Sequence, residues 1–126
     1  MLVVDDSVVM RLAIQRAIGI SGLAVEYCMT AEHGKAALSL LKDQKINLML
    51  VDLNMPDMSG GDLIRCLRDQ PAKNAIPFIA ISGDATATRM QEMLDLGALA
   101  YIPKPFTPAT LRLEMAKASE HMYVCN

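Results

Sequence analysis

Aromatic residues and long apolar runs are both scarce in this sequence. Aromatics make up 4% of the 126 residues and tryptophan is absent, so aliphatic side chains and ten methionines must fill the core. No apolar run approaches the roughly 20 residues that cross a membrane. The apolar start Met1–Val4 stops at two aspartates and follows no basic segment, which is unlike a signal peptide. We therefore expect no membrane association and a cytoplasmic location.

Basic charge, paired cysteines and glycine-rich phosphate loops are also lacking. The formal net charge is −2, which argues against direct binding to nucleic acid. Cys28, Cys66 and Cys125 form no CxxC motif, so we expect reduced, mostly buried thiols in a cytosolic protein. His33 and His121 have no partner at ligand spacing and are predicted to lie at the surface. No GxxxxGK[ST] motif occurs, which argues against a nucleotide-binding enzyme.

Short apolar runs alternate with amphipathic stretches along the whole chain. The length fits one domain, residues 1–126. Five runs have the length of strands: Met1–Val4, Leu23–Cys28, Leu48–Val51, Phe78–Ser82 and Leu99–Ile102. Five stretches have apolar residues at helical spacing: Ser7–Ile18, Glu32–Lys42, Ser59–Arg68, Ala87–Leu96 and Pro108–Ser119.

Helix boundary signals agree with this alternation. Ser7 and Thr107 can cap helix starts, and Pro108 suits a first helical position. Gly97 follows the fourth helix where a C-terminal glycine is expected. Strands that alternate with helices predict an α/β fold, a five-stranded parallel sheet with five helices on both faces. Ligands of such folds bind at the carboxyl ends of the strands.

Charged and polar residues stand at that edge of the predicted sheet. Asp5 and Asp6 follow the first strand, and Asp52 follows the apolar run 48–51. Ser82 closes the fourth strand and Lys104 follows the fifth. Clustered carboxylates repel one another, and a divalent cation such as Mg2+ relieves that repulsion. A carboxylate can also attack phosphorus and form an aspartyl phosphate, with an amine and a hydroxyl to stabilise the transferring group.

Four segments carry a resemblance to a known family. They are VVDDS (3–7), VDLNMPDMSG (51–60), ISG (81–83) and YIPKPF (101–106). In this order they resemble the receiver domain of two-component response regulators, the CheY-like group, over nearly the whole chain. The resemblance implies a flavodoxin-like fold with strand order 2-1-3-4-5, the order that CheY itself has.

The resemblance also implies roles for the residues at the sheet edge. Asp52 would be the phosphoacceptor, and Lys104 would contact the phosphoryl group. Mg2+ (or Mn2+) would be held by Asp52 together with Asp6 directly and Asp5 largely through water. The backbone carbonyl of Asn54 would be a further metal ligand.

A second group of residues is implied to respond to phosphorylation. Ser82 would move toward the phosphoryl group, and Tyr101 would turn inward as Ser82 shifts. Asn54 and Asp84 would flank the group and tune how fast water removes it. The peptide bond before Pro105 is expected to be cis. The surface formed by the fourth helix, fifth strand and fifth helix would then change its binding properties.

The resemblance implies partners as well. A sensor histidine kinase or histidine phosphotransfer protein would supply the phosphoryl group, and a downstream target or a fused output domain would respond. The chain would then be a phosphoacceptor signalling domain that promotes its own phosphorylation and dephosphorylation, not an enzyme. The alternative is a phosphorylation-independent pseudo-receiver that acts as an interaction module, and the full set of acidic and basic residues argues against it.

Two enzyme-like or cofactor-binding alternatives fit the residues less well. A haloacid-dehalogenase type of enzyme has a second aspartate two residues after the first, and Asn54 stands there. A flavodoxin cradles a phosphate at the turn where this chain has Asp5 and Asp6, whose charges would repel it.

Overall fold

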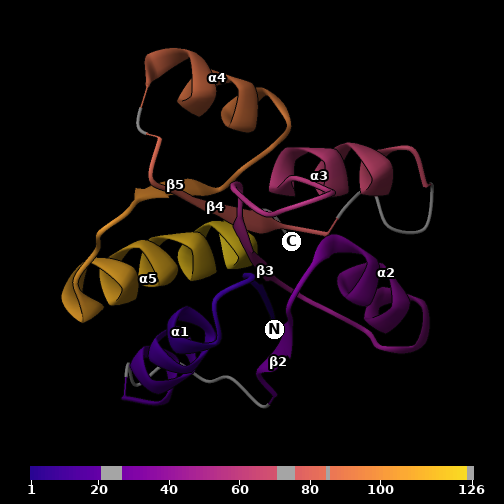
Figure 1. The fold of residues 1–126 in the computed structure, drawn as a ribbon. Helices are drawn as coiled ribbons and strands as arrows, with labels where there is room; N and C mark the ends of the chain where they lie inside the picture. The colour runs from indigo at the N-terminus through magenta and orange to yellow at the C-terminus, as the bar shows by residue number, and fades with distance from the viewer. Residues whose placement is uncertain (21–26, 71–75, 85, 125–126) are drawn as a thin grey trace.

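Helices cover both faces of a parallel sheet in the computed structural model of the chain, which describes residues 1–20, 27–70, 76–84 and 86–124 (Figure 1). The strands are β1 (Leu2–Val4), β2 (Met29–Ala31), β3 (Met49–Asp52), β4 (Phe78–Ser82) and β5 (Ala100–Pro103). The helices are α1 (Val8–Ile20), α2 (Gly34–Asp43), α3 (Gly60–Arg68), α4 (Ala87–Asp95) and α5 (Pro108–Val124). The sheet order is β2-β1-β3-β4-β5 with parallel neighbours, so the predicted fold class is confirmed.

The strands are apolar along their length because helices cover both of their faces. Leu2 and Val4 of β1 belong to a core cluster with α2, α3 and Met93 of α4. Val3 between them belongs to a second cluster with α1 and α5. Figure 1 shows the same division, with α1 and α5 together on one side of the sheet. Alternate residues of one strand therefore enter two different cores.

The second strand lies later in the chain than predicted. Of the predicted strand Leu23–Cys28, residues 23–26 lie outside the described residues, and Tyr27 and Cys28 are not in a strand. The strand is instead Met29–Ala31, which pairs with β1 from Leu2↔Met29 to Val4↔Ala31. It is an edge strand with one neighbour, so its position is set by the register on β1 rather than by its own apolar pattern.

The helix boundary signals are confirmed. The Ser7 hydroxyl accepts a hydrogen bond from the Met10 amide at 3.2 Å, and that of Thr107 accepts from the Thr110 amide at 3.1 Å. Helix α5 begins at Pro108. Gly97 has a φ of 98°, a conformation that favours glycine after a helix.

Two of the three cysteines, Cys28 and Cys66, lie in the described part of the chain. Cys28 and Cys66 are free and only half-buried, which corrects the prediction of mostly buried thiols, and Cys125 lies outside the described residues. Cys28 precedes β2 and packs only against the rim of the core formed with α1 and α5, and Cys66 is not among the residues that α3 buries. Within the described part of the chain, no helix has the length and apolar character needed to cross a membrane.

The topology places one edge of the sheet at a switch point. The chain continues from β1 to β2 on one side and from β3 to β4 on the other, so the crossovers diverge between β1 and β3. Loops that leave neighbouring strands in opposite directions create a crevice at the carboxyl ends of those strands. Asp5 follows β1 there and Asp52 is the last residue of β3.

Candidate functional site

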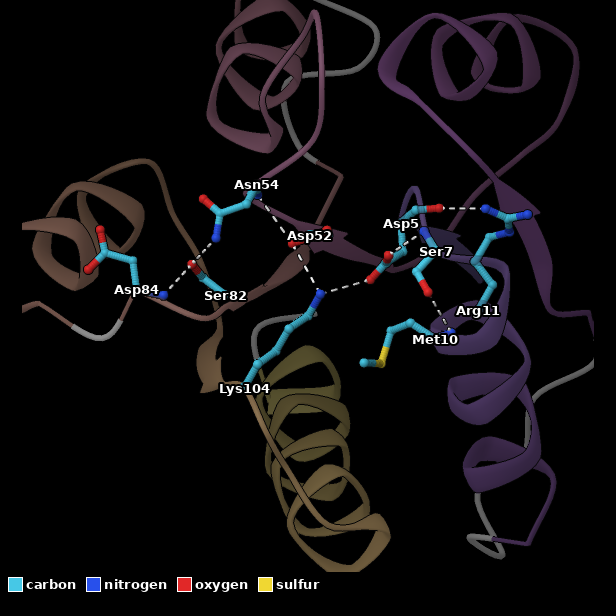
Figure 2. A network of polar contacts seen from close by, with 9 residues as sticks. All are labelled: Asp5, Ser7, Met10, Arg11, Asp52, Asn54, Ser82, Asp84 and Lys104. Carbon is cyan, nitrogen blue, oxygen red and sulfur yellow. Dashed lines mark hydrogen bonds and ion pairs between the residues drawn. The ribbon is translucent and has the colours of Figure 1, made fainter.

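The predicted site residues meet at the carboxyl ends of β1, β3, β4 and β5. Figure 2 shows Asp5, Asp52, Ser82 and Lys104 converging from four segments that are far apart in the sequence. Asp52 pairs with Ile81 in the sheet, so it belongs to β3 itself rather than to the loop after it. The parallel topology thus brings the charges together, as the sequence pattern predicted.

Three carboxylates form an acidic pocket. One oxygen from each of Asp5, Asp6 and Asp52 lies within 4.8 Å of the other two. Asp5 and Asp52 are buried, at 1% and 2% exposure, whereas Asp6 is exposed. Carboxylate oxygens are hard donors, the kind of ligand that Mg2+ prefers. The exposed side of the pocket, at Asp6, leaves room for waters on the ion. The donor set therefore fits the predicted metal.

Lys104 places its ammonium between the two buried carboxylates. Its Nζ lies 3.2 Å from Asp5 Oδ2 and 3.4 Å from Asp52 Oδ1. The Lys104 amide also donates to the Ser82 carbonyl at 2.7 Å, which continues the alignment of β5 with β4. The peptide bond between Lys104 and Pro105 is cis, as predicted. One cation is thus held against two charges that would otherwise repel each other.

Burial raises the pKa of the Asp52 carboxyl above its ordinary value, because desolvation disfavours the charged form. The Asn54 amide, which donates to Oδ1 at 3.2 Å, opposes that shift. The nearby charge of Asp5 adds to the shift, and Lys104 opposes it. Asp52 is therefore a carboxylate whose negative charge the fold makes costly, and neutralisation or a bound cation would relieve it.

Gly60 allows the backbone to pack directly behind Asp52. A Cβ at this position would lie 2.4 Å from the Asp52 carbonyl oxygen and 2.9 Å from Leu53 Cα. Both are backbone atoms, so they cannot move aside without shifting the end of β3. In the sequence, Gly60 stands only within the predicted helical stretch Ser59–Arg68, and the close approach is visible only in the folded chain.

Ser82 is the centre of a second, uncharged group of contacts. Its buried hydroxyl accepts from Asn54 Nδ2 at 3.1 Å and from the Asp84 amide at 3.0 Å. The Tyr101 hydroxyl donates to the Asp84 carbonyl, and the Tyr101 ring is half-buried. The structure thus brings together the four residues predicted to respond to phosphorylation. Their movement, and the metal-ligand role of the Asn54 carbonyl, stay predictions.

Two residues make contacts that the sequence pattern did not indicate. The Arg11 guanidinium donates to the Asp5 backbone carbonyl at 2.7 Å, and only the way α1 packs beside β1 reveals this bond. His33 is exposed, as predicted, and its Nδ1 also accepts from the Ala36 amide at 3.0 Å and caps α2. Histidine is not among the usual capping residues, so this residue type carries little signal for a helix start. The His121 side chain lies outside the described residues.

Comparison with known proteins agrees with this arrangement. A family model described as "Response regulator receiver domain" matches residues 1–116. The chain is 34% identical over 113 residues to the chemotaxis protein CheY homolog of Campylobacter jejuni, covering 89% of this chain and 85% of that protein. It is 35% identical over 122 residues to the two-component response regulator ARR7 of Arabidopsis thaliana, covering 88% of this chain.

The chain spans 58% of the length of ARR7. Among solved structures, the chemotaxis response regulator CheY4 of Vibrio cholerae superposes with a TM-score of 0.82 at 26% identity, covering 93% of this chain and 95% of that one. The fold and the acidic edge define an α/β domain of the CheY-like type. By its sequence, the chain belongs to the response regulator receiver domain family of two-component systems.

Proposed function

We propose that this domain is a phosphorylation-controlled switch in which Asp52 accepts a phosphoryl group. The observation that carries the proposal is the acidic pocket, in which carboxylate oxygens of Asp5, Asp6 and Asp52 lie within 4.8 Å of one another. Lys104 Nζ adds a positive charge 3.4 Å from Asp52. An acceptor carboxylate, oxygen donors for a metal and a cation at one edge match the needs of phosphoryl transfer.

The phosphoryl donor is a phosphohistidine on a sensor histidine kinase or a histidine phosphotransfer protein. A carboxylate oxygen of Asp52 forms a bond to phosphorus while the bond from phosphorus to the histidine nitrogen breaks, and the imidazole leaves with the electron pair. Asp5, Asp6, Asp52 and the Asn54 carbonyl would hold Mg2+ (or Mn2+), and the ion would supply positive charge for the phosphoryl oxygens. Lys104, already aimed at Asp52, holds a further oxygen.

The response to phosphorylation starts at the Ser82 contacts. The hydroxyl of Ser82 leaves its present partners, Asn54 and Asp84, and donates to a phosphoryl oxygen. Tyr101, bonded to the Asp84 carbonyl, loses that anchor when the loop shifts and turns inward. The surface of α4, β5 and α5 then changes its affinity for a downstream target or a fused output domain. Asn54 and Asp84, both exposed, tune the access of water to the phosphoryl group.

The decisive experiment is the intact mass of the protein after incubation with acetyl phosphate, with and without Mg2+. We expect a metal-dependent gain of one phosphoryl group in the wild type and none in Asp52→Ala. Asp57→Asn is the matched control, because Asp57 is an exposed aspartate of the same loop. Asn also tolerates the φ of 66° found there. Equal phosphorylation of Asp52→Ala would refute the assignment, and no gain under any metal would favour the pseudo-receiver.

A further inference from the structure

Every polar atom of Asp5 has a hydrogen-bonding or ionic partner. Its amide donates to the Ala31 carbonyl at 3.1 Å, and its carbonyl accepts from the Arg11 guanidinium at 2.7 Å. Its carboxylate accepts from the Ser7 amide at 2.9 Å and pairs with Lys104 at 3.2 Å. Figure 2 shows Arg11 reaching back from α1 to the backbone of Asp5. Of these four partners, Arg11 supplies the one charged group that holds the backbone.

The hydrogen bond from Arg11 also constrains the residue that follows Asp5. The Asp5 carbonyl belongs to the peptide unit that joins Asp5 to Asp6, and a peptide unit is planar. Fixing the direction of that oxygen therefore restricts the direction in which the Asp6 backbone continues. A short, charge-assisted bond to a half-buried guanidinium is stronger than a neutral hydrogen bond.

Asp6 has no comparable support of its own. It is exposed, and its carboxylate makes no hydrogen bond or ion pair to any residue that the structure describes. Its oxygen nevertheless lies within 4.8 Å of those of Asp5 and Asp52. The placement of the Asp6 carboxylate therefore depends on the backbone that carries it, and Arg11 holds that backbone from one side.

We propose that Arg11 is a positioning residue for the metal site: by holding the Asp5 carbonyl, it aims Asp6 into the acidic pocket. This inference rests on the proposed function, because it assigns Arg11 to the metal site of that function. Arg11 does not contact the metal or the phosphoryl group. Its contribution is to reduce the conformational freedom that Asp6 must lose when it binds a cation.

Electrostatics alone predicts the opposite change in Mg2+ affinity, so the direction of the measured change tests the proposal. Arg11 carries a positive charge close to a site that binds a cation, so removing that charge should strengthen Mg2+ binding. Removing the bond to the Asp5 carbonyl should weaken Mg2+ binding if Arg11 positions Asp6. The direction of the change in Mg2+ affinity therefore shows which of the two effects is larger.

The experiment is a Mg2+ titration of the unphosphorylated protein, followed by calorimetry, for the wild type and four variants. Arg11→Ala is expected to weaken binding about tenfold, the lower end of effects seen for residues that orient metal ligands. Arg11→Gln loses the charge but keeps a donor, and Arg11→Lys keeps the charge with a shorter reach, so both should be intermediate. Arg16→Ala, an exposed arginine of the same helix, should bind like the wild type.

Two further readouts separate positioning from general destabilisation. Thermal unfolding of the metal-free variants should change little. Hydrogen exchange of the Ser7 amide, which follows Asp6 and donates to Asp5 Oδ1 at 2.9 Å, should become faster in Arg11→Ala. At saturating Mg2+, phosphorylation of Arg11→Ala by acetyl phosphate should recover toward the wild-type rate, because the metal then holds Asp6 itself. If Arg11→Ala does not fold, Arg11→Gln carries the same test.

The possible failures are distinguishable. Unchanged or tighter Mg2+ binding by the folded Arg11 variants, beside normal binding by the wild type, would overturn the role of Arg11 and leave the proposed function intact. Absence of Mg2+ binding by the wild type would overturn the metal site and the role of Arg11 together. Equal weakening by Arg16→Ala would show a non-specific effect of charge on α1 and would also overturn the proposal.

Discussion

Two loops flank Asp52, and they hold their residues in different ways. In the loop between β1 and α1, all four polar atoms of Asp5 are bound, and two of the partners are the charged groups of Arg11 and Lys104. At the end of β4, where the loop to α4 begins, Ser82 is buried. Its partners Asn54 and Asp84 are exposed and bind it through single uncharged hydrogen bonds.

This difference indicates that the two loops have different roles around the Asp52 carboxylate. Bonds from charged groups hold the side on which a metal would be bound, so that its ligands lose little freedom on binding. Neutral bonds to exposed partners are exchanged for water or for a phosphoryl oxygen at small cost. The first loop is therefore suited to remain in place, and the second is suited to rearrange when Asp52 is modified.

The largest expected effect comes from removing the ammonium group of Lys104, which pairs with both buried carboxylates. Lys104→Met leaves Asp5 and Asp52 as two buried carboxylates without their shared cation. Breaking a buried pair typically costs 3–5 kcal/mol; because the lysine side chain is 24% exposed, we expect a loss of about 2 kcal/mol at neutral pH. Urea denaturation measures it, and saturating Mg2+ should restore part of the loss.

Lys104→Arg keeps the charge and serves as the control for this variant. Ser82→Ala is the matched change on the uncharged side, where we expect a loss of about 1 kcal/mol that does not depend on Mg2+. If Ser82→Ala proved as costly as Lys104→Met, or equally sensitive to Mg2+, the contrast between the two loops would be wrong.

A smaller effect is expected from the charge of Asp52 itself. Burial raises the pKa of this carboxyl in the folded state, so folding favours its protonated form. The resulting stability is fully present below the unfolded-state pKa and is lost as the pH rises through the folded-state pKa. Asp52→Asn removes the charge and should therefore be about 1 kcal/mol more stable than the wild type at neutral pH, without metal.

Urea denaturation across the acidic to neutral range tests this prediction, since the advantage of Asp52→Asn should vanish toward acid pH. Asp57→Asn, an exposed position in the same loop, should show no such dependence. An Asp52→Asn protein that is less stable at neutral pH would mean that the attraction of Lys104 outweighs desolvation.

The smallest effect is expected from restricting the backbone of the β4–α4 loop at Gly83. A Cβ at Gly83 meets no atom within 4 Å, so Gly83→Ala should fit and reduce the entropy of the unfolded chain. We expect a gain of about 0.5 kcal/mol in the free energy of unfolding. Gly97→Ala is the control with the opposite sign, because its φ of 98° is strained for alanine. A loss of stability in Gly83→Ala would show that this loop is packed more tightly than its contacts indicate.

Local sequence patterns were sufficient for most of the fold. The apolar run Phe78–Ser82 predicted β4 with the observed bounds, and Ser7 and Pro108 marked the starts of helices. Buried parallel strands are continuous apolar runs, and helix caps are local contacts, so both are visible in the sequence. The second strand was misplaced because an edge strand depends on its neighbour, and Met29–Ala31 has no strong pattern of its own.

The sequence by itself determined which chemical groups reach the carboxyl edge of the sheet, because Asp5, Asp52, Ser82 and Lys104 each stand at the end of an apolar run. The tertiary structure alone decided how they are held. The bond from Arg11 to the Asp5 carbonyl and the close approach at Gly60 join segments whose proximity depends on packing. Residue type and spacing encode local structure, whereas a distance between packed elements is fixed only when both cores have formed.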